Sequence, residues 1–292
     1  MSSSTALLPS GSNRKNDHPI FLRACHSPWL SITQKLLVFL RAVLAAYLVI
    51  SFLVILDYEL EVKKIGWFAA FKLSNIVFGL QALYACVTFT WTFMHLYYPH
   101  NNDNSYSSVS GGVRKLLSPS RRNTNSNEKY SFSVFHWASL TFPHLVTFIH
   151  WVVLVPRNEI SIPSGAIFDD KLATFYIFNK FGFNSVLAFI ELFILSSIKR
   201  SDTIWSHAFA IAFLILLYVG WAAIGNALFC KYSYFFLDHE KIGWEYYWAS
   251  VVGMVFLAEI FYVFVHAITG VRESMTKRQS EDRSTGYQRL PQ

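Results

Sequence analysis

Residues 71–98, FKLSNIVFGLQALYACVTFTWTFMHLYY, are sufficient to indicate an integral membrane protein. The stretch exceeds the roughly 20 residues that a helix rising about 1.5 Å per residue needs to cross a bilayer. Four polar residues recur in it every seventh position: Ser74, Gln81, Thr88 and His95. Seven residues nearly complete two helical turns, drifting by only about 20°, so these four form one polar stripe.

Lipid would penalise the polar stripe, so it must face other helices or a water-filled cavity. Two interpretations follow: interhelical hydrogen bonding within a bundle, or the lining of a functional site. We expect the stripe to face the fourth apolar span, bringing Ser74 near Lys180 and Asn184, because that span also carries polar side chains.

The composition supports a membrane protein. The 292 residues are 53% hydrophobic and 15% charged, whereas about a quarter of the residues of a soluble domain are charged. The net charge of +7 lies in tails and loops without aromatic interleaving, which favours anionic lipid headgroups over nucleic acid as partner. Three scattered cysteines suggest neither a disulfide framework nor a zinc site, and we expect no metal or cofactor.

The sequence predicts an all-α polytopic membrane protein, a bundle of six transmembrane helices within residues 34–270. The predicted spans are 36–56, 71–98, 132–155, 172–196, 205–229 and 245–269. The first is interrupted by Arg41, which we expect to snorkel to the interface. Residues 1–33 and 271–292 are predicted to be disordered tails, and residues 99–131 a flexible loop, because they cannot bury a core.

Loop charges predict the orientation. The tails and loops on the N-terminal side hold fifteen Lys and Arg residues, and the opposite loops hold six. Because basic loops stay in the cytosol, both termini and the 99–131 loop should be cytosolic, consistent with an even number of spans.

Ionisable and amide side chains inside the spans are candidates for an intramembrane polar site. Lys180, Asn184 and Glu191 share one face of the fourth span, which suggests either a Lys–Glu pair or a hydrated pocket. The full set of candidates is Asn75, Gln81, Lys180, Asn184, Glu191, Glu259 and His266. The alternative is that these groups only join helices to one another. The histidines of the third span, His136, His144 and His150, lack metal-ligand spacing, which favours a packing role.

Several short motifs occur in series: KLSN at 72–75, LQALY at 80–84, LTFP at 140–143 and YFFLDH at 234–239. In this order they resemble the androgen-induced-gene-like membrane proteins, a group that in the broad sense includes the rolling-stone proteins. The similarity covers residues 36–270 without the 99–131 loop, and the fourth span is more similar to the rolling-stone branch. The resemblance implies a six-span protein of the endomembrane system or plasma membrane.

In the androgen-induced branch the resemblance also implies hydrolysis of fatty-acid esters of hydroxy fatty acids, with a membrane-embedded threonine as nucleophile and a histidine as base. The threonine position matches Ser74, whereas the histidine position falls within 180–185, where Phe183 stands and no histidine occurs. A serine hydroxyl needs a base, so His144, His150 or His207 of another helix would have to supply it.

Two hypotheses for function remain open. The first is a non-enzymatic, multi-pass protein of the rolling-stone type, acting in membrane organisation or adhesion. The alternative is a membrane-embedded lipid-ester hydrolase with Ser74 as nucleophile.

The C-terminal tail contains a sorting pattern. Tyr287 and Leu290 fit the tyrosine-x-x-bulky-apolar signal that clathrin adaptors bind as an extended strand. This pattern predicts traffic among the trans-Golgi network, endosomes and the plasma membrane or vacuole. Chance occurrence is the competing interpretation, because two of the four positions are free.

Overall fold

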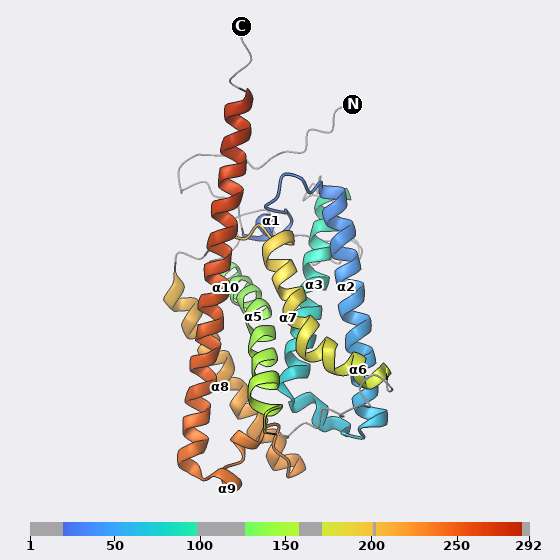
Figure 1. Cartoon of the computed structure of the whole chain (residues 1–292), viewed down its shortest axis with the longest axis vertical. Helices are drawn as coiled ribbons and strands as arrows, with labels where there is room; N and C mark the ends of the chain where they lie inside the picture. Colours follow the sequence, from blue (N-terminus) through green and yellow to red (C-terminus); the bar gives the residue numbers. More distant parts are fainter. Residues whose placement is uncertain (1–19, 98–125, 158–170, 201–202, 288–292) are drawn as a thin grey trace, which may run out of the picture.

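The computed structural model describes residues 20–97, 126–157, 171–200 and 203–287. Every regular element in these ranges is a helix. Six of the resulting segments are long and apolar enough to cross a membrane. They are Gln34–Val62, Leu73–Tyr97, Asn127–Leu154, Lys171–Leu195, Ile204–Phe229 and Trp244–Lys277. The predicted all-α bundle of six spans is confirmed (Figure 1).

The third span is the centre of the bundle. Its α-helix, α5 (Ser126–Phe148), packs against α3 (Leu73–Tyr97), α7 (Asn184–Ile190), α8 (Ile204–Phe229) and α10 (Trp244–Tyr287). Of the 18-residue apolar stretch of this span 72% is buried, compared with 28% of the corresponding stretches of the fifth and sixth spans. α8 and α10 therefore present wide apolar surfaces, including Phe209 and Phe256, of the kind that contacts lipid tails.

Four π-helical segments interrupt the spans. They are η2 (Tyr58–Val62) after α2 (Gln34–Asp57), η4 (Ile149–Leu154) after α5, and η5 (Asn179–Phe183) and η6 (Glu191–Leu195) on either side of α7. The fourth span begins with α6 (Lys171–Phe178). A π-helical turn carries an extra residue, so it changes which side chains face inward, and such turns are frequent at functional sites.

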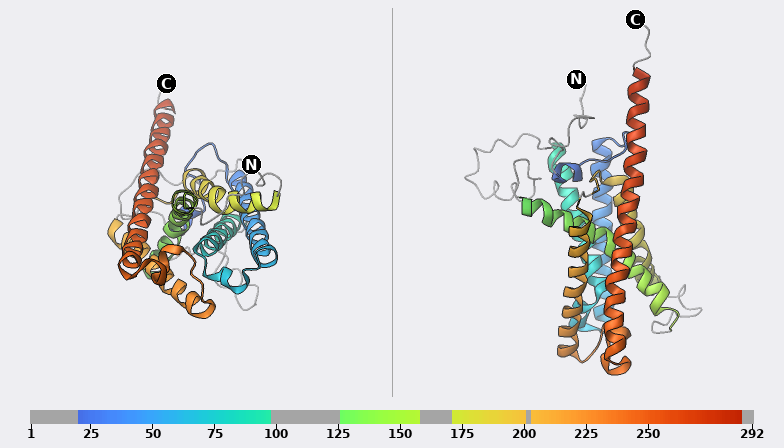
Figure 2. Two further views of the ribbon diagram at one scale, coloured as in Figure 1. Left: turned by 60° about the horizontal axis from the view of Figure 1, so that its bottom comes forward. Right: turned by 90° about the vertical axis from the view of Figure 1, so that its left-hand side faces the viewer.

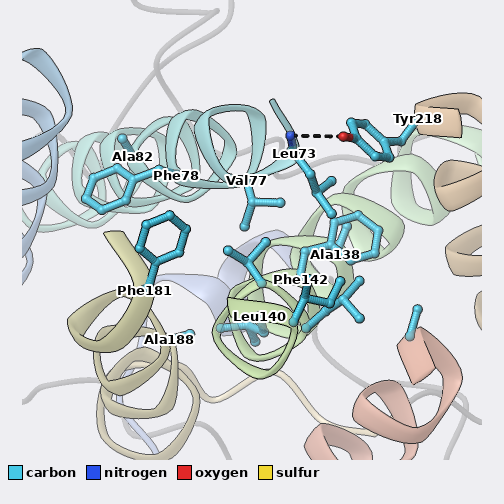
Figure 3. Packing of buried hydrophobic residues seen from close by; sticks show 14 of the residues in the cluster. Leu73, Val77, Phe78, Ala82, Ala138, Leu140, Phe142, Phe181, Ala188 and Tyr218 are labelled. Carbon is cyan, nitrogen blue, oxygen red and sulfur yellow. Dashed lines mark hydrogen bonds between the residues drawn. The ribbon is translucent and has the colours of Figure 1, made fainter. Parts of the chain in front are cut away.

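The entry into α3 is fixed by contact with α8. The short 3₁₀ helix η3 (Gly66–Phe71) stacks Phe71 on Trp221 with ring centroids 4.8 Å apart. Gly225 lies beneath the same ring, where an added Cβ would come within 2.6 Å of Phe71. The Tyr218 hydroxyl accepts a hydrogen bond from the Leu73 amide at 3.3 Å (Figure 3). These contacts position the residues that follow, Lys72 and Ser74.

Arg41 does not snorkel to the interface as expected. It is 1% exposed, and its guanidinium lies 3.3 Å from the Glu191 carboxylate. The same group donates to the backbone carbonyls of Leu195 at 2.9 Å and Thr88 at 3.2 Å. The last carbonyls of a helix have no intrahelical partner, and the guanidinium supplies donors for them. Arg41 is therefore held between the first, second and fourth spans.

Arg272 of α10 also donates hydrogen bonds to carbonyls at the end of the fourth span. It donates to the carbonyls of Leu192 at 2.7 Å and Ser196 at 2.6 Å, and also to that of Ile198. Two buried arginines from two helices thus supply hydrogen-bond donors to the backbone carbonyls at the end of the fourth span.

Part of each expected disordered segment is ordered. Residues 20–33 include α1 (Ile20–Ala24), where Phe21 packs between Trp91 and Phe132 with ring centroids 5.4 and 5.3 Å apart. Trp29 donates its indole N–H to the Phe193 carbonyl at 2.7 Å. Isolated aromatic residues without helical periodicity gave no local indication of this docking. The structure therefore gives residues 20–33 defined contacts where the sequence predicted a disordered tail.

The last helix also continues further than expected. α10 runs to Tyr287 and projects beyond the other helices (Figure 2, right). The sequence after Thr269 contains no proline before Pro291, so the backbone can remain helical. The structure thus has residues 271–287 in α10, where the sequence predicted a disordered tail, and α5 likewise begins within the predicted 99–131 loop. Tyr287 of the sorting pattern ends α10, and Leu290 lies outside the described residues.

Candidate functional site

A cavity of about 280 Å³ lies at the end of the bundle where α9 (His239–Ile242) is found. Its polar lining consists of Tyr58, Lys63, Lys72, Ser74, His150, Tyr176, Lys180, Ser233 and Tyr234. Its apolar lining includes Leu154, Ile177 and Phe181. Three π-helical segments, η2, η4 and η5, each contribute lining residues. We call this space the Glu59 cavity, after the carboxylate that pairs with Lys72 and Lys180.

Glu59 is the centre of a buried ionic network. Its Oε1 atom accepts from Lys180 Nζ at 2.7 Å, from the Tyr176 hydroxyl at 2.7 Å and from Lys72 Nζ at 3.4 Å. Its Oε2 atom accepts from the Asn75 side-chain amide. The side chains of Glu59 and Lys180 are both 0% exposed. Burial of such charges is tolerated only when they are paired and hydrogen-bonded, and this network meets both conditions.

Positive charge exceeds negative charge in the lining. Lys63 places its ammonium 4.0 Å from the centroid of the Tyr176 ring and forms no ion pair with a described residue. Partial burial, reinforced by the positive charge of Lys72, lowers the pKa of Lys63, and the negative charge of Glu59 opposes this shift in part. On the opposite wall burial raises the pKa of Tyr234, with a further contribution from Tyr218, so the Tyr234 hydroxyl remains a donor.

Ser74 and His150 line the same cavity from different helices. His150 is 1% exposed and stacks on Phe181 with ring centroids 3.7 Å apart. Neither of its ring nitrogens has a hydrogen-bond partner among the described residues, so Ser74 and His150 are not bonded to each other. A histidine with free nitrogens beside a serine hydroxyl is a candidate base once a ligand or water bridges the two.

Several predicted site residues meet between the second and fourth spans. Asn75 and Lys180 join the Glu59 network, and Ser74 lines the same cavity as Lys180. Gln81 donates its amide to the Asn184 backbone carbonyl at 3.0 Å. The polar stripe therefore faces the fourth span at these positions. The Asn184 side chain is fully buried, and its amide has no hydrogen-bond partner among the described residues.

Other predicted site residues lie elsewhere. Glu191 pairs with Arg41 and not with Lys180, so the expected pairing within the fourth span is corrected: each residue has a partner on the first span. Glu259 and His266 are on α10 and do not line the Glu59 cavity. The His266 ring packs 5.7 Å from Trp137, in keeping with a packing role.

Sequence reasoning missed Glu59, which it placed in a short loop after the first span. The helix instead continues through η2 and carries Glu59 inward. One signal was present: Leu48, Ser51, Ile55 and Glu59 are spaced by three or four residues, the period of a buried helix face. All four are buried.

Within the described ranges no group of three His, Cys, Asp or Glu residues is placed to hold a metal ion. Comparison with models of protein families, with curated proteins and with solved structures gave no match to this chain.

Proposed function

We propose that this multi-pass membrane protein binds a lipid ester in the Glu59 cavity and hydrolyses it, with Ser74 as nucleophile and His150 as base. The observation that carries the proposal is that both side chains line one cavity, where neither imidazole nitrogen has a hydrogen-bond partner among the described residues. The resemblance to the androgen-induced-gene-like proteins supports the same nucleophile position. The apolar side chains of Leu154, Ile177 and Phe181 offer a surface for an acyl chain.

The proposed reaction is a two-step acyl transfer. His150 removes the proton from Ser74 while Oγ attacks the ester carbonyl carbon. The ester C–O bond then breaks, and the departing alcohol takes the proton from His150. Water, deprotonated by His150, attacks the acyl-serine, which releases the fatty acid and restores Ser74.

Labelling of the purified protein with a serine-reactive fluorophosphonate and turnover of a fluorogenic lipid ester test this proposal. Ser74→Ala should abolish labelling and lower turnover by about 10³-fold or more, because the attacking oxygen is lost. His150→Asn should lower turnover by about 10²-fold or more without abolishing folding. Ser139→Ala is the matched control: Ser139 is buried in α5 and lies outside the cavity. Undiminished labelling of the Ser74→Ala variant would refute the assignment.

A non-enzymatic role of the rolling-stone type, in membrane organisation or adhesion, is the second candidate. It is favoured by the lack of a hydrogen bond between Ser74 and His150, since an assembled catalytic pair holds the hydroxyl on the base. Absence of both labelling and turnover in a folded wild-type protein would select this candidate.

We also propose that both termini are cytosolic, in the endomembrane system or plasma membrane. The support is the excess of Lys and Arg on the N-terminal side. α1 and the C-terminal end of α10 lie at one end of the bundle (Figure 1). Protease added to sealed vesicles with native orientation should therefore remove tags from both termini, and protection of either tag would contradict this orientation.

A further inference from the structure

The Glu59 cavity holds three ammonium groups but one carboxylate among the described residues that form it. Lys72 and Lys180 both contact the same Glu59 oxygen, at 3.4 and 2.7 Å, and Lys63 forms no ion pair with any carboxylate of the described residues. Asp57 and Glu61, the nearest acidic residues in sequence, are exposed and do not line the cavity. Among the described residues, positive charges around the cavity therefore exceed negative charges by two.

The three lysines form a graded path into the protein. Lys63 is exposed, the Lys72 side chain is 24% exposed, and the Lys180 side chain is 0% exposed. Lys180 is already held by Glu59 and Tyr176, so the charge that can bind a ligand is at Lys63 and Lys72, in the outer part of the cavity. Uncompensated charge next to apolar walls favours entry of an anion, because the attraction is strong where water is scarce.

We propose that Lys63 and Lys72 bind the phosphate monoester of a lipid headgroup whose acyl ester lies deeper in the Glu59 cavity. A phosphate monoester carries about −1.5 to −2 charges at neutral pH, which matches the excess of two positive charges among the described residues around the cavity. A lysine ammonium binds phosphate as a point charge on a flexible side chain. It does not require the planar, bidentate geometry of an arginine pair. Leu154 and Phe181 supply apolar contact for the lipid part.

This inference rests on the proposed function, because it uses the same cavity, but it does not require that hydrolysis occurs there. Binding and turnover can therefore fail independently. Binding is therefore measured on the Ser74→Ala protein, which cannot consume the ligand by the proposed route. The probe is dihexanoyl phosphatidic acid, titrated calorimetrically into the protein in detergent. Dihexanoyl phosphatidylcholine, with a capped phosphate, and inorganic phosphate are the comparison ligands.

We expect saturable binding of the phosphatidic acid that is at least about 10-fold tighter than that of either comparison ligand. Adding Lys63→Gln and Lys72→Gln should weaken binding by at least about 10-fold, because each removes one charge. Lys64→Gln is the matched control: Lys64 adjoins Lys63, is exposed and does not line the cavity. If the Lys72 variant fails to fold, Lys63→Gln alone should still weaken binding several-fold. This variant should fold, because the Lys63 ammonium contacts only the rings of Tyr58 and Tyr176 among the described residues.

Four results would overturn the inference. Equal affinity for the choline ester would show that the phosphate monoester is not recognised. Equal affinity for inorganic phosphate would show that the lipid contributes nothing. Equal weakening by Lys64→Gln would show diffuse attraction to a basic surface. Turnover of an ester by the wild type without phosphatidic acid binding would refute this inference alone and leave the proposed hydrolysis standing.

Discussion

Glu59→Gln is expected to destabilise the folded protein by about 3–5 kcal/mol, because it removes the only ion-pair partner of Lys180 among the described residues. The ammonium group would remain fully buried with a neutral amide in place of a carboxylate, and the Lys72 contact would weaken as well. Thermal unfolding in detergent, followed by tryptophan fluorescence, measures the loss. Glu61→Gln is the matched control, since Glu61 lies in the same π-helical segment and is exposed.

A double variant separates charge from shape. Glu59→Gln combined with Lys180→Met removes both charges, so most of the lost stability should return. An unfolding temperature of the Glu59→Gln protein equal to that of the wild type would show that Lys180 is solvated or deprotonated and that the ion pair does not stabilise the fold.

Arg41→Met should produce a loss of similar size, about 3–5 kcal/mol, at the opposite end of the bundle. It leaves the Glu191 carboxylate buried without its counter-ion and takes a donor from the Leu195 carbonyl. The same unfolding assay measures the effect. Lys35→Gln, an exposed position of the same helix, serves as control.

Here the compensating change should restore only part of the stability. Adding Glu191→Gln removes the unpaired charge, but the carbonyls at the end of the fourth span still lack their donor. Complete rescue by Glu191→Gln would show that the carbonyl contacts of Arg41 contribute nothing, and no loss in Arg41→Met would show that the ion pair is dispensable.

These two networks explain why charged residues occur in apolar spans of this protein. Each joins the first span to the fourth, one through Glu59 and Lys180 and the other through Arg41 and Glu191. Lys180 and Glu191 are close in sequence and lie on one span, but they do not pair with each other. Each binds a residue at an opposite end of the first span. The Glu59 pair adjoins the Glu59 cavity, which Lys180 lines, whereas Arg41 and Glu191 do not line it.

The sequence by itself determined the six spans and the inward direction of the polar stripe. Both follow from local rules: the length of an apolar run fixes a span, and the helical period fixes a face. Ser74 and Gln81 accordingly lie where that period places them, one lining the cavity and one contacting the fourth span.

Only the tertiary structure decided the partners. Glu59 became central because a π-helical turn extends the first span beyond its apolar run, and His150 reaches the cavity of Ser74 through another such turn. Arg41 is buried because the end of the fourth span offers it carbonyls that no local pattern reveals. Hydropathy records how each segment partitions between water and lipid, whereas the choice of counter-ion depends on which helices become neighbours and how each is rotated. The choice of partner is therefore decided by contacts between residues more than a hundred positions apart, such as Glu59 with Lys180.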